Sequence, residues 1–154
     1  MKRSSTIVLQ VIVVLIGASA VALLLWEPQV EGRNVHASLS QIYFGDPFLV
    51  YAYAASTPFF VALYQAFKVL AYAGQDRLFS RDAVKALRTI RYCGAAIVGL
   101  VALGELFIGL GDSDDRAGGV FMGILIALGA IILAAAAATV ERALQKRMGS
   151  TYAD

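Results

Sequence analysis

Residues 119–140 read GVFMGILIALGAIILAAAAATV and contain no charged side chain. A stretch of this kind has about the 20 apolar residues that a helix needs to cross the hydrocarbon core of a bilayer. Lipid offers no partner to an unpaired backbone N–H or C=O group, so a spanning segment must satisfy these groups internally. The stretch therefore predicts a transmembrane α-helix.

Three further apolar stretches precede it, at residues 6–26, 48–73 and 92–110. The first is uncharged, the second carries Lys68 near its end, and the third carries Glu105. Each is again close to the length of a membrane span. We expect four transmembrane helices.

The composition of the whole chain agrees with this expectation. The 154 residues are 59% hydrophobic and 16% charged, and the mean hydropathy is +0.71. A soluble domain carries about 25% charged and about 45–50% apolar residues, and one cysteine, Cys93, forms no internal disulfide framework. These numbers exclude a soluble enzyme, a disordered chain and a disulfide scaffold. They predict an all-α membrane protein, a helical bundle with residues 1–154 as one integral membrane domain.

The basic residues predict the orientation of this bundle. All Lys and Arg except Arg33 and Arg116 fall at the N-terminus, in or just before residues 74–91, or in the C-terminal tail. Acidic residues predominate in the two loops on the other side. Lys and Arg are retained on the cytoplasmic side of a membrane. We therefore expect both termini and the basic segment 74–91 to be cytoplasmic.

Small residues follow one face of the last span. Gly119, Gly123 and Ala127 begin a stripe that Ala130, Ala134 and Ala138 continue at steps of three or four residues. Small residues let transmembrane helices approach closely. The stripe predicts a packing seam, either against the chain's own helices or against a second copy in a homo-oligomer. The glycines of span 92–110 recur at steps of five and define no single face.

Glu105 is the one acidic residue within a predicted span. An ionisable residue inside a membrane is costly and marks a functional site by default. Tyr53 of the second span lies at a similar predicted depth, so Glu105 and Tyr53 are a candidate intramembrane polar site. The pair can act as a hydrogen-bonded latch between helices. The alternative is a proton or cation relay beside a helix bend at Pro58.

The segment before the third span predicts a basic amphipathic helix. Ser80 is a suitable N-cap. Arg81, Lys85 and Arg88 then occupy one side and are candidate cytoplasmic contact residues. Two occupants of this surface remain open, namely anionic lipid headgroups and a cytoplasmic protein. Direct contact with nucleic acid is not expected, because no nucleic-acid-binding fold accompanies these charges.

No pattern of catalytic or metal-binding residues is present. Residues 112–115 read DSDD but lack the glycine and the distant glutamate of a calcium loop. His36 is the only histidine and has no partner at zinc-site spacing. We expect no enzyme activity, no metal and no cofactor.

Two stretches resemble a known family, the bacterial domain of unknown function 2975. They are Tyr43 to Leu49 (YFGDPFL), which leads into the second span, and Phe79 to Cys93, which leads into the third. The resemblance implies a small four-helix protein of the bacterial inner membrane and implies no activity. Some members are encoded beside helix-turn-helix regulators, which suggests a regulatory protein as a cytoplasmic partner.

The sequence thus predicts an uncharacterised, non-enzymatic, multi-pass membrane protein that acts through protein partners or as a regulatory or structural membrane component. The alternative is a small transporter or channel subunit that uses Glu105.

Overall fold

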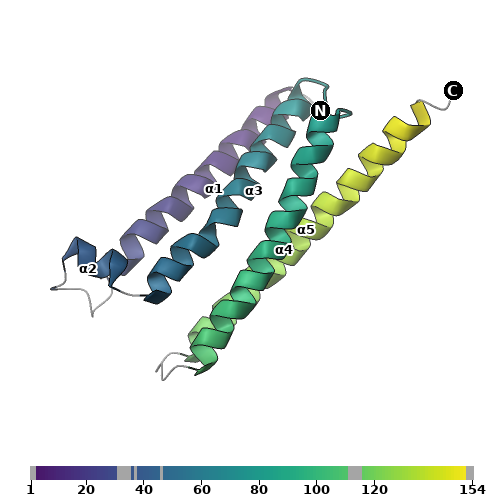
Figure 1. Cartoon of the computed structure of the whole chain (residues 1–154). Helices are drawn as coiled ribbons and strands as arrows, with labels where there is room; N and C mark the ends of the chain where they lie inside the picture. Colours follow the sequence, from purple (N-terminus) through teal and green to yellow (C-terminus); the bar gives the residue numbers. More distant parts are fainter. Residues whose placement is uncertain (1–2, 31–35, 37, 46, 111–115, 152–154) are drawn as a thin grey trace.

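A computed structural model describes residues 3–30, 36, 38–45, 47–110 and 116–151 and shows five helices there (Figure 1). These are α1 (Arg3–Val30), α2 (Leu39–Phe44), α3 (Pro47–Gly74), α4 (Arg81–Leu110) and α5 (Arg116–Thr151). Arg33 and the acidic stretch 112–115 lie outside the described residues. The predicted all-α class is confirmed.

Four of the helices are long and apolar enough to cross a membrane. They contain the four predicted spans, and the candidate spanning segments run over Ser4–Val30, Pro47–Gly74, Arg81–Gly109 and Ala117–Gly149. Helix α4 begins well before its apolar part, because Ser80 caps it. The Ser80 hydroxyl accepts a hydrogen bond from the backbone N–H of Ala83 at 3.2 Å. Residues 81–91 of the basic segment 74–91 are therefore the first three turns of α4.

Two features of the helices were not predicted. The short helix α2 starts with a capping box, in which the Ser38 hydroxyl accepts from the Gln41 N–H at 3.4 Å and the Gln41 side chain accepts from the Ser38 N–H at 3.0 Å. Ser-x-x-Gln is a readable start signal for a helix. Helix α5 also continues from Val140 to Thr151, through the part of the chain that we expected to be a tail.

The long helices stand side by side in chain order (Figure 1). α1 packs on α3, α3 on α4 and α4 on α5, and no extended contact joins α1 to α5 among the described residues. At the α1–α3 contact, Thr6 lies against Gly74 and the Gln10 side chain donates to the Phe67 carbonyl at 3.5 Å. Each long helix is antiparallel to the next, so the start of α1, the start of α4 and the end of α5 share one end of the molecule.

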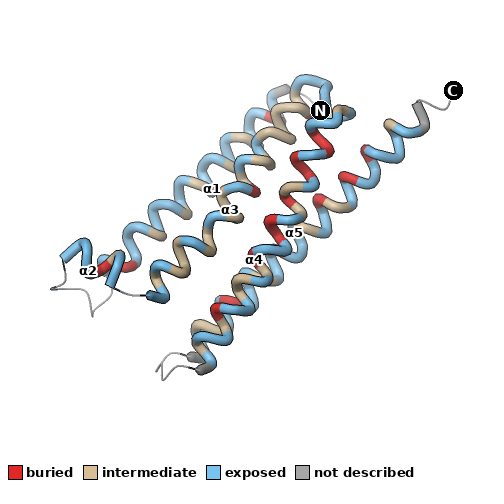
Figure 2. The backbone as a smooth tube through the Cα atoms, viewed as in Figure 1, coloured by how far each residue is buried: buried red, intermediate tan, exposed pale blue. Residues whose placement is uncertain are grey.

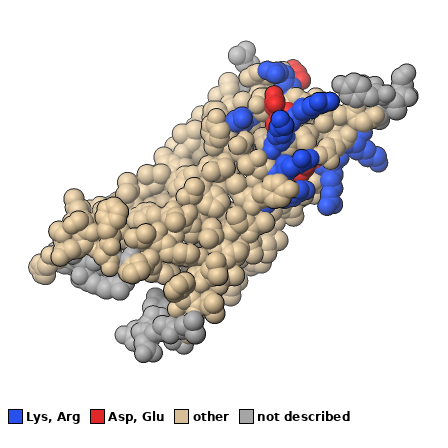
Figure 3. All heavy atoms as spheres, viewed as in Figure 1, with Lys and Arg blue, Asp and Glu red and all other residues tan. Residues whose placement is uncertain are grey.

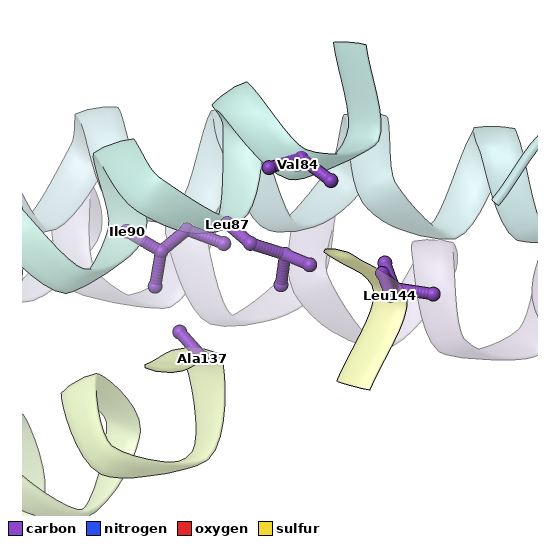
Figure 4. Close-up of a cluster of buried hydrophobic side chains, with 5 residues drawn as sticks. All are labelled: Val84, Leu87, Ile90, Ala137 and Leu144. Carbon is purple, nitrogen blue, oxygen red and sulfur yellow. The ribbon is translucent and has the colours of Figure 1, made fainter. Parts of the chain in front are cut away.

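Buried residues concentrate along α4 and one face of α5 (Figure 2). Five of them, Val84, Leu87, Ile90, Ala137 and Leu144, form a cluster between these helices (Figure 4). None of the most apolar window of α1 is buried. Large apolar side chains instead cover the outer faces of α1 and α5, as expected of helices that face lipid.

Candidate functional site

Helices α4 and α5 approach each other closely at Gly94, near the middle of their contact. A Cβ atom on Gly94 would lie 2.8 Å from the Ala134 Cβ and 2.9 Å from the Ala130 carbonyl oxygen. Both distances are shorter than van der Waals contact. The two backbones approach this closely only because Gly94 has no side chain and its partners on α5 are alanines.

The small-residue stripe of α5 contacts α4 at Gly119, Gly123, Ala130 and Ala134. A Cβ on Gly119 would lie 3.1 Å from the Ile108 side chain, and one on Gly123 would lie 3.3 Å from Val101 and collide with Glu105. Ala127, the next residue of the stripe, is half-buried. Of the two partners that the sequence left open for the stripe, the contacts at Gly119 and Gly123 are with the chain's own helix α4.

Glu105 projects from α4 into this seam. Its carboxylate rests directly on Gly123, where even a methyl group would displace Oε1. Its other oxygen, Oε2, is buried and has no hydrogen-bond partner in the described part of the chain. The seam thus contains a carboxyl group that packs against α5 without an identified donor.

The predicted partner of Glu105 lies elsewhere. The Tyr53 hydroxyl donates to the Leu24 carbonyl of α1 at 2.6 Å. Tyr51, two residues earlier, is the tyrosine that reaches α4: its hydroxyl donates to the Leu100 carbonyl, and its ring lies against Gly104. Two residues of a helix correspond to a rotation of about 200°, so the two tyrosines face opposite neighbours. The structure does not bring Glu105 and Tyr53 together.

Lys and Arg side chains gather at one end of the molecule, which we call the basic end (Figure 3). It comprises the last turns of α3, the first turns of α4 and the last turns of α5. Its basic residues are Lys68, Arg77, Arg81, Lys85, Arg88, Arg91, Arg142, Lys146 and Arg147. Described acidic residues at this end are Asp76, Asp82 and Glu141, so positive charge predominates there.

Glu141 is the buried member of this group, and sequence reasoning missed it. Its carboxylate accepts from Arg88 Nε at 2.9 Å and lies 3.2 Å from Arg91 Nη1. Gln145, one turn further along α5, donates to it at 3.2 Å. One signal was available, because Glu141 extends the small-residue face of α5 one turn beyond Ala137.

The three candidate contact residues of α4 therefore differ in their surroundings. Arg88 is tied to Glu141. Arg81 and Lys85 are exposed, and neither side chain forms an ion pair with any residue that the structure describes. Of the three, Arg81 and Lys85 are the ones without an ion-pair partner among the described residues.

Lys68 lies on α3 near the same end. Its ammonium is 5.7 Å from the centre of the Tyr64 ring, one turn back along the helix. An aliphatic stem on an aromatic ring lets a lysine keep its charge close to the membrane surface.

Comparisons with known proteins agree with the membrane assignment. Residues 3–147 match the family described as "Protein of unknown function (DUF2975)". The "Uncharacterized membrane protein YoaS" of Bacillus subtilis (strain 168) is 33% identical over 148 residues, which cover 95% of this chain and 92% of that relative. No solved structure matches the chain.

Proposed function

The chain belongs to the DUF2975 family and is a multi-pass membrane protein; from this premise we propose that it acts without catalysis, by binding a cytoplasmic regulatory protein at its basic end. In this proposal the protein lies in the bacterial inner membrane, with both termini in the cytoplasm.

The orientation is supported by the distribution of charge. The basic residues of α3, α4 and α5 meet at one end of the helices (Figure 3). Basic residues next to spans are retained on the cytoplasmic side. The start of α1 and the end of α5 share that end, so the proposed orientation makes both termini cytoplasmic.

The observation that carries the partner proposal is the exposure of Arg81 and Lys85 in the first two turns of α4. The spacing of four residues puts both on one side of the helix. The opposite side of the same turns is fixed in place, because Ala83, Val84 and Leu87 are buried. A rigid, cationic helix face is suited to an acidic surface on a protein partner.

The test is a photo-crosslinking experiment in native membranes. A photoreactive amino acid replaces Lys85. In a parallel experiment it replaces Leu128, an exposed apolar residue within a span. We expect a defined protein adduct at residue 85 and none at residue 128. The change Arg81→Glu should reduce the adduct at residue 85 at least about fivefold.

The matched control for charge is Arg142→Glu, which reverses one exposed basic residue of α5 at the same end. This variant should keep most of the adduct. If both variants lose the same amount of protein adduct, binding depends only on the overall charge. If the probe at residue 85 crosslinks to lipid and to no protein, the proposal of a protein partner is wrong.

A second candidate function is favoured by Glu105 Oε2, which is buried within a span without a described partner. We propose that, if the protein moves an ion, Glu105 is the site, in a homo-oligomer that supplies the rest of the path. Proton or cation flux into liposomes should then disappear in Glu105→Gln and persist in Glu27→Gln, a change at an exposed carboxyl. A wild-type protein without flux at any pH tested removes this candidate.

A further inference from the structure

The cluster of Arg88, Arg91 and Glu141 occupies a particular height in the molecule. Arg91 directly precedes the apolar part of α4, and Glu141 directly follows the apolar part of α5. Two spans therefore end at the level of this cluster. Where the apolar part of a span ends, the chain enters the layer of lipid headgroups.

The buried carboxylate of Glu141 holds the two guanidinium groups in position. The side chain of Glu141 is 4% exposed, whereas those of Arg88 and Arg91 are 48% and 35% exposed. Arg88 donates from its Nε to Glu141 Oε1, whereas Arg91 Nη1 forms an ion pair with Oε2 at 3.2 Å without a hydrogen bond. Each guanidinium has five N–H donors in a planar fork, so both keep donors on the side that faces outward.

From this arrangement we infer that the Arg88–Glu141–Arg91 cluster binds the phosphate of an anionic phospholipid headgroup. Two guanidinium groups against one carboxylate leave a net positive charge. Guanidinium forks match the geometry of phosphate oxygens. This site goes beyond the proposed function, because the protein partner is assigned to Arg81 and Lys85 and not to this cluster.

Aromatic side chains at the same level support a lipid as the ligand. The Arg91 guanidinium lies 5.2 Å from the centre of the Tyr92 ring, and Tyr92 is largely exposed. Tyrosine is enriched at the headgroup level of membranes. The excess of positive charge around the phosphate position favours an anionic headgroup over a zwitterionic one.

The test measures lipid binding to the purified protein in a neutral detergent by native mass spectrometry. The probes are phosphatidylglycerol, phosphatidylcholine and inorganic phosphate. For the wild type we expect one tightly bound phosphatidylglycerol, and at least about tenfold weaker binding of phosphatidylcholine. Arg88→Gln with Arg91→Gln should weaken phosphatidylglycerol binding at least about tenfold.

Two variants make this result specific. Arg88→Lys with Arg91→Lys keeps the charges and the pairing with Glu141 but removes the forks, and should weaken binding at least about threefold. Arg142→Gln with Lys146→Gln removes two positive charges from exposed positions outside the cluster. This variant should weaken phosphatidylglycerol binding less than threefold. Three results would each overturn the inference. They are a lysine variant that binds phosphatidylglycerol as tightly as the wild type, an α5 control that weakens binding as much as Arg88→Gln with Arg91→Gln, and displacement of the lipid by inorganic phosphate.

Discussion

Gly94 and Gly99 differ in what surrounds them, although they lie five residues apart on α4. Gly94 lies against Ala134 and the Ala130 carbonyl of α5, whereas no atom lies within 4 Å of the position that a Cβ on Gly99 would take. Five residues turn a helix by about 500°, so successive glycines at this spacing face different neighbours. Gly104, five residues further, lies against Tyr51 of α3.

Substitution of alanine at these two glycines, which adds one methyl group each time, therefore tests the close contact at Gly94. Gly94→Ala should lower the free energy of unfolding by about 1–3 kcal/mol, because the added methyl overpacks the seam. Gly99→Ala should leave stability unchanged or raise it by up to about 1 kcal/mol, since alanine is the better helix former. The measurement is thermal unfolding of both variants in the same detergent. Equal stability of the two would contradict the close approach at Gly94.

At the scale of residues, the sequence predicted what depends on neighbours in the chain. The Ser80 cap is such a case, since the cap and the helix that it starts are adjacent in the chain. The Glu105–Tyr53 site is the opposite case. Position along a span gives the depth of a side chain, but the rotation of one helix against another depends on packing. Tyr51, and not Tyr53, therefore faces α4.

Helices α4 and α5 are joined at three heights. Glu105 packs on Gly123 toward one end, Gly94 on Ala130 and Ala134 near the middle, and Arg88 and Arg91 pair with Glu141 at the basic end. The first two contacts require small residues, whereas the third is ionic. A carboxylate that is buried between two arginines also joins the helices at this end, because separating them would leave its charge buried and unpaired.

Removal of the charge of Glu141 should therefore destabilise the α4–α5 pair. For Glu141→Gln we expect a loss of about 2 kcal/mol, below the cost of breaking a fully buried pair because both arginines are half-exposed. Thermal unfolding in detergent measures it, with Glu27→Gln, an exposed site at the opposite end, as control. If both variants unfold at the wild-type temperature, the ion pairs do not hold the helices together.

The whole molecule is a row of four membrane-length helices with its positive charge at one end. The sequence predicted the spans because lipid imposes length and apolarity on each of them separately. The order of the helices in the row could not be predicted, because a face that meets lipid and a face that meets a helix are both apolar. The ion pairs of Glu141 were missed for a similar reason, since the pair with Arg88 joins side chains 53 residues apart.

The proposed orientation predicts where reporter proteins are active. Alkaline phosphatase folds to an active enzyme outside the cytoplasm and green fluorescent protein fluoresces inside it. With both termini cytoplasmic, a C-terminal fusion should fluoresce and lack phosphatase activity, whereas a phosphatase inserted between α4 and α5 should be active. The reverse pattern would place the basic end outside and contradict the proposal.

The neighbour-to-neighbour packing of the long helices also bears on biogenesis. Every extended contact between the described long helices joins two that are consecutive among them along the chain. Each long helix therefore finds its packing partner in the bilayer as soon as the next long helix has been synthesised and inserted. Assembly can proceed in the order of synthesis, without a wait for the C-terminal end to close a ring.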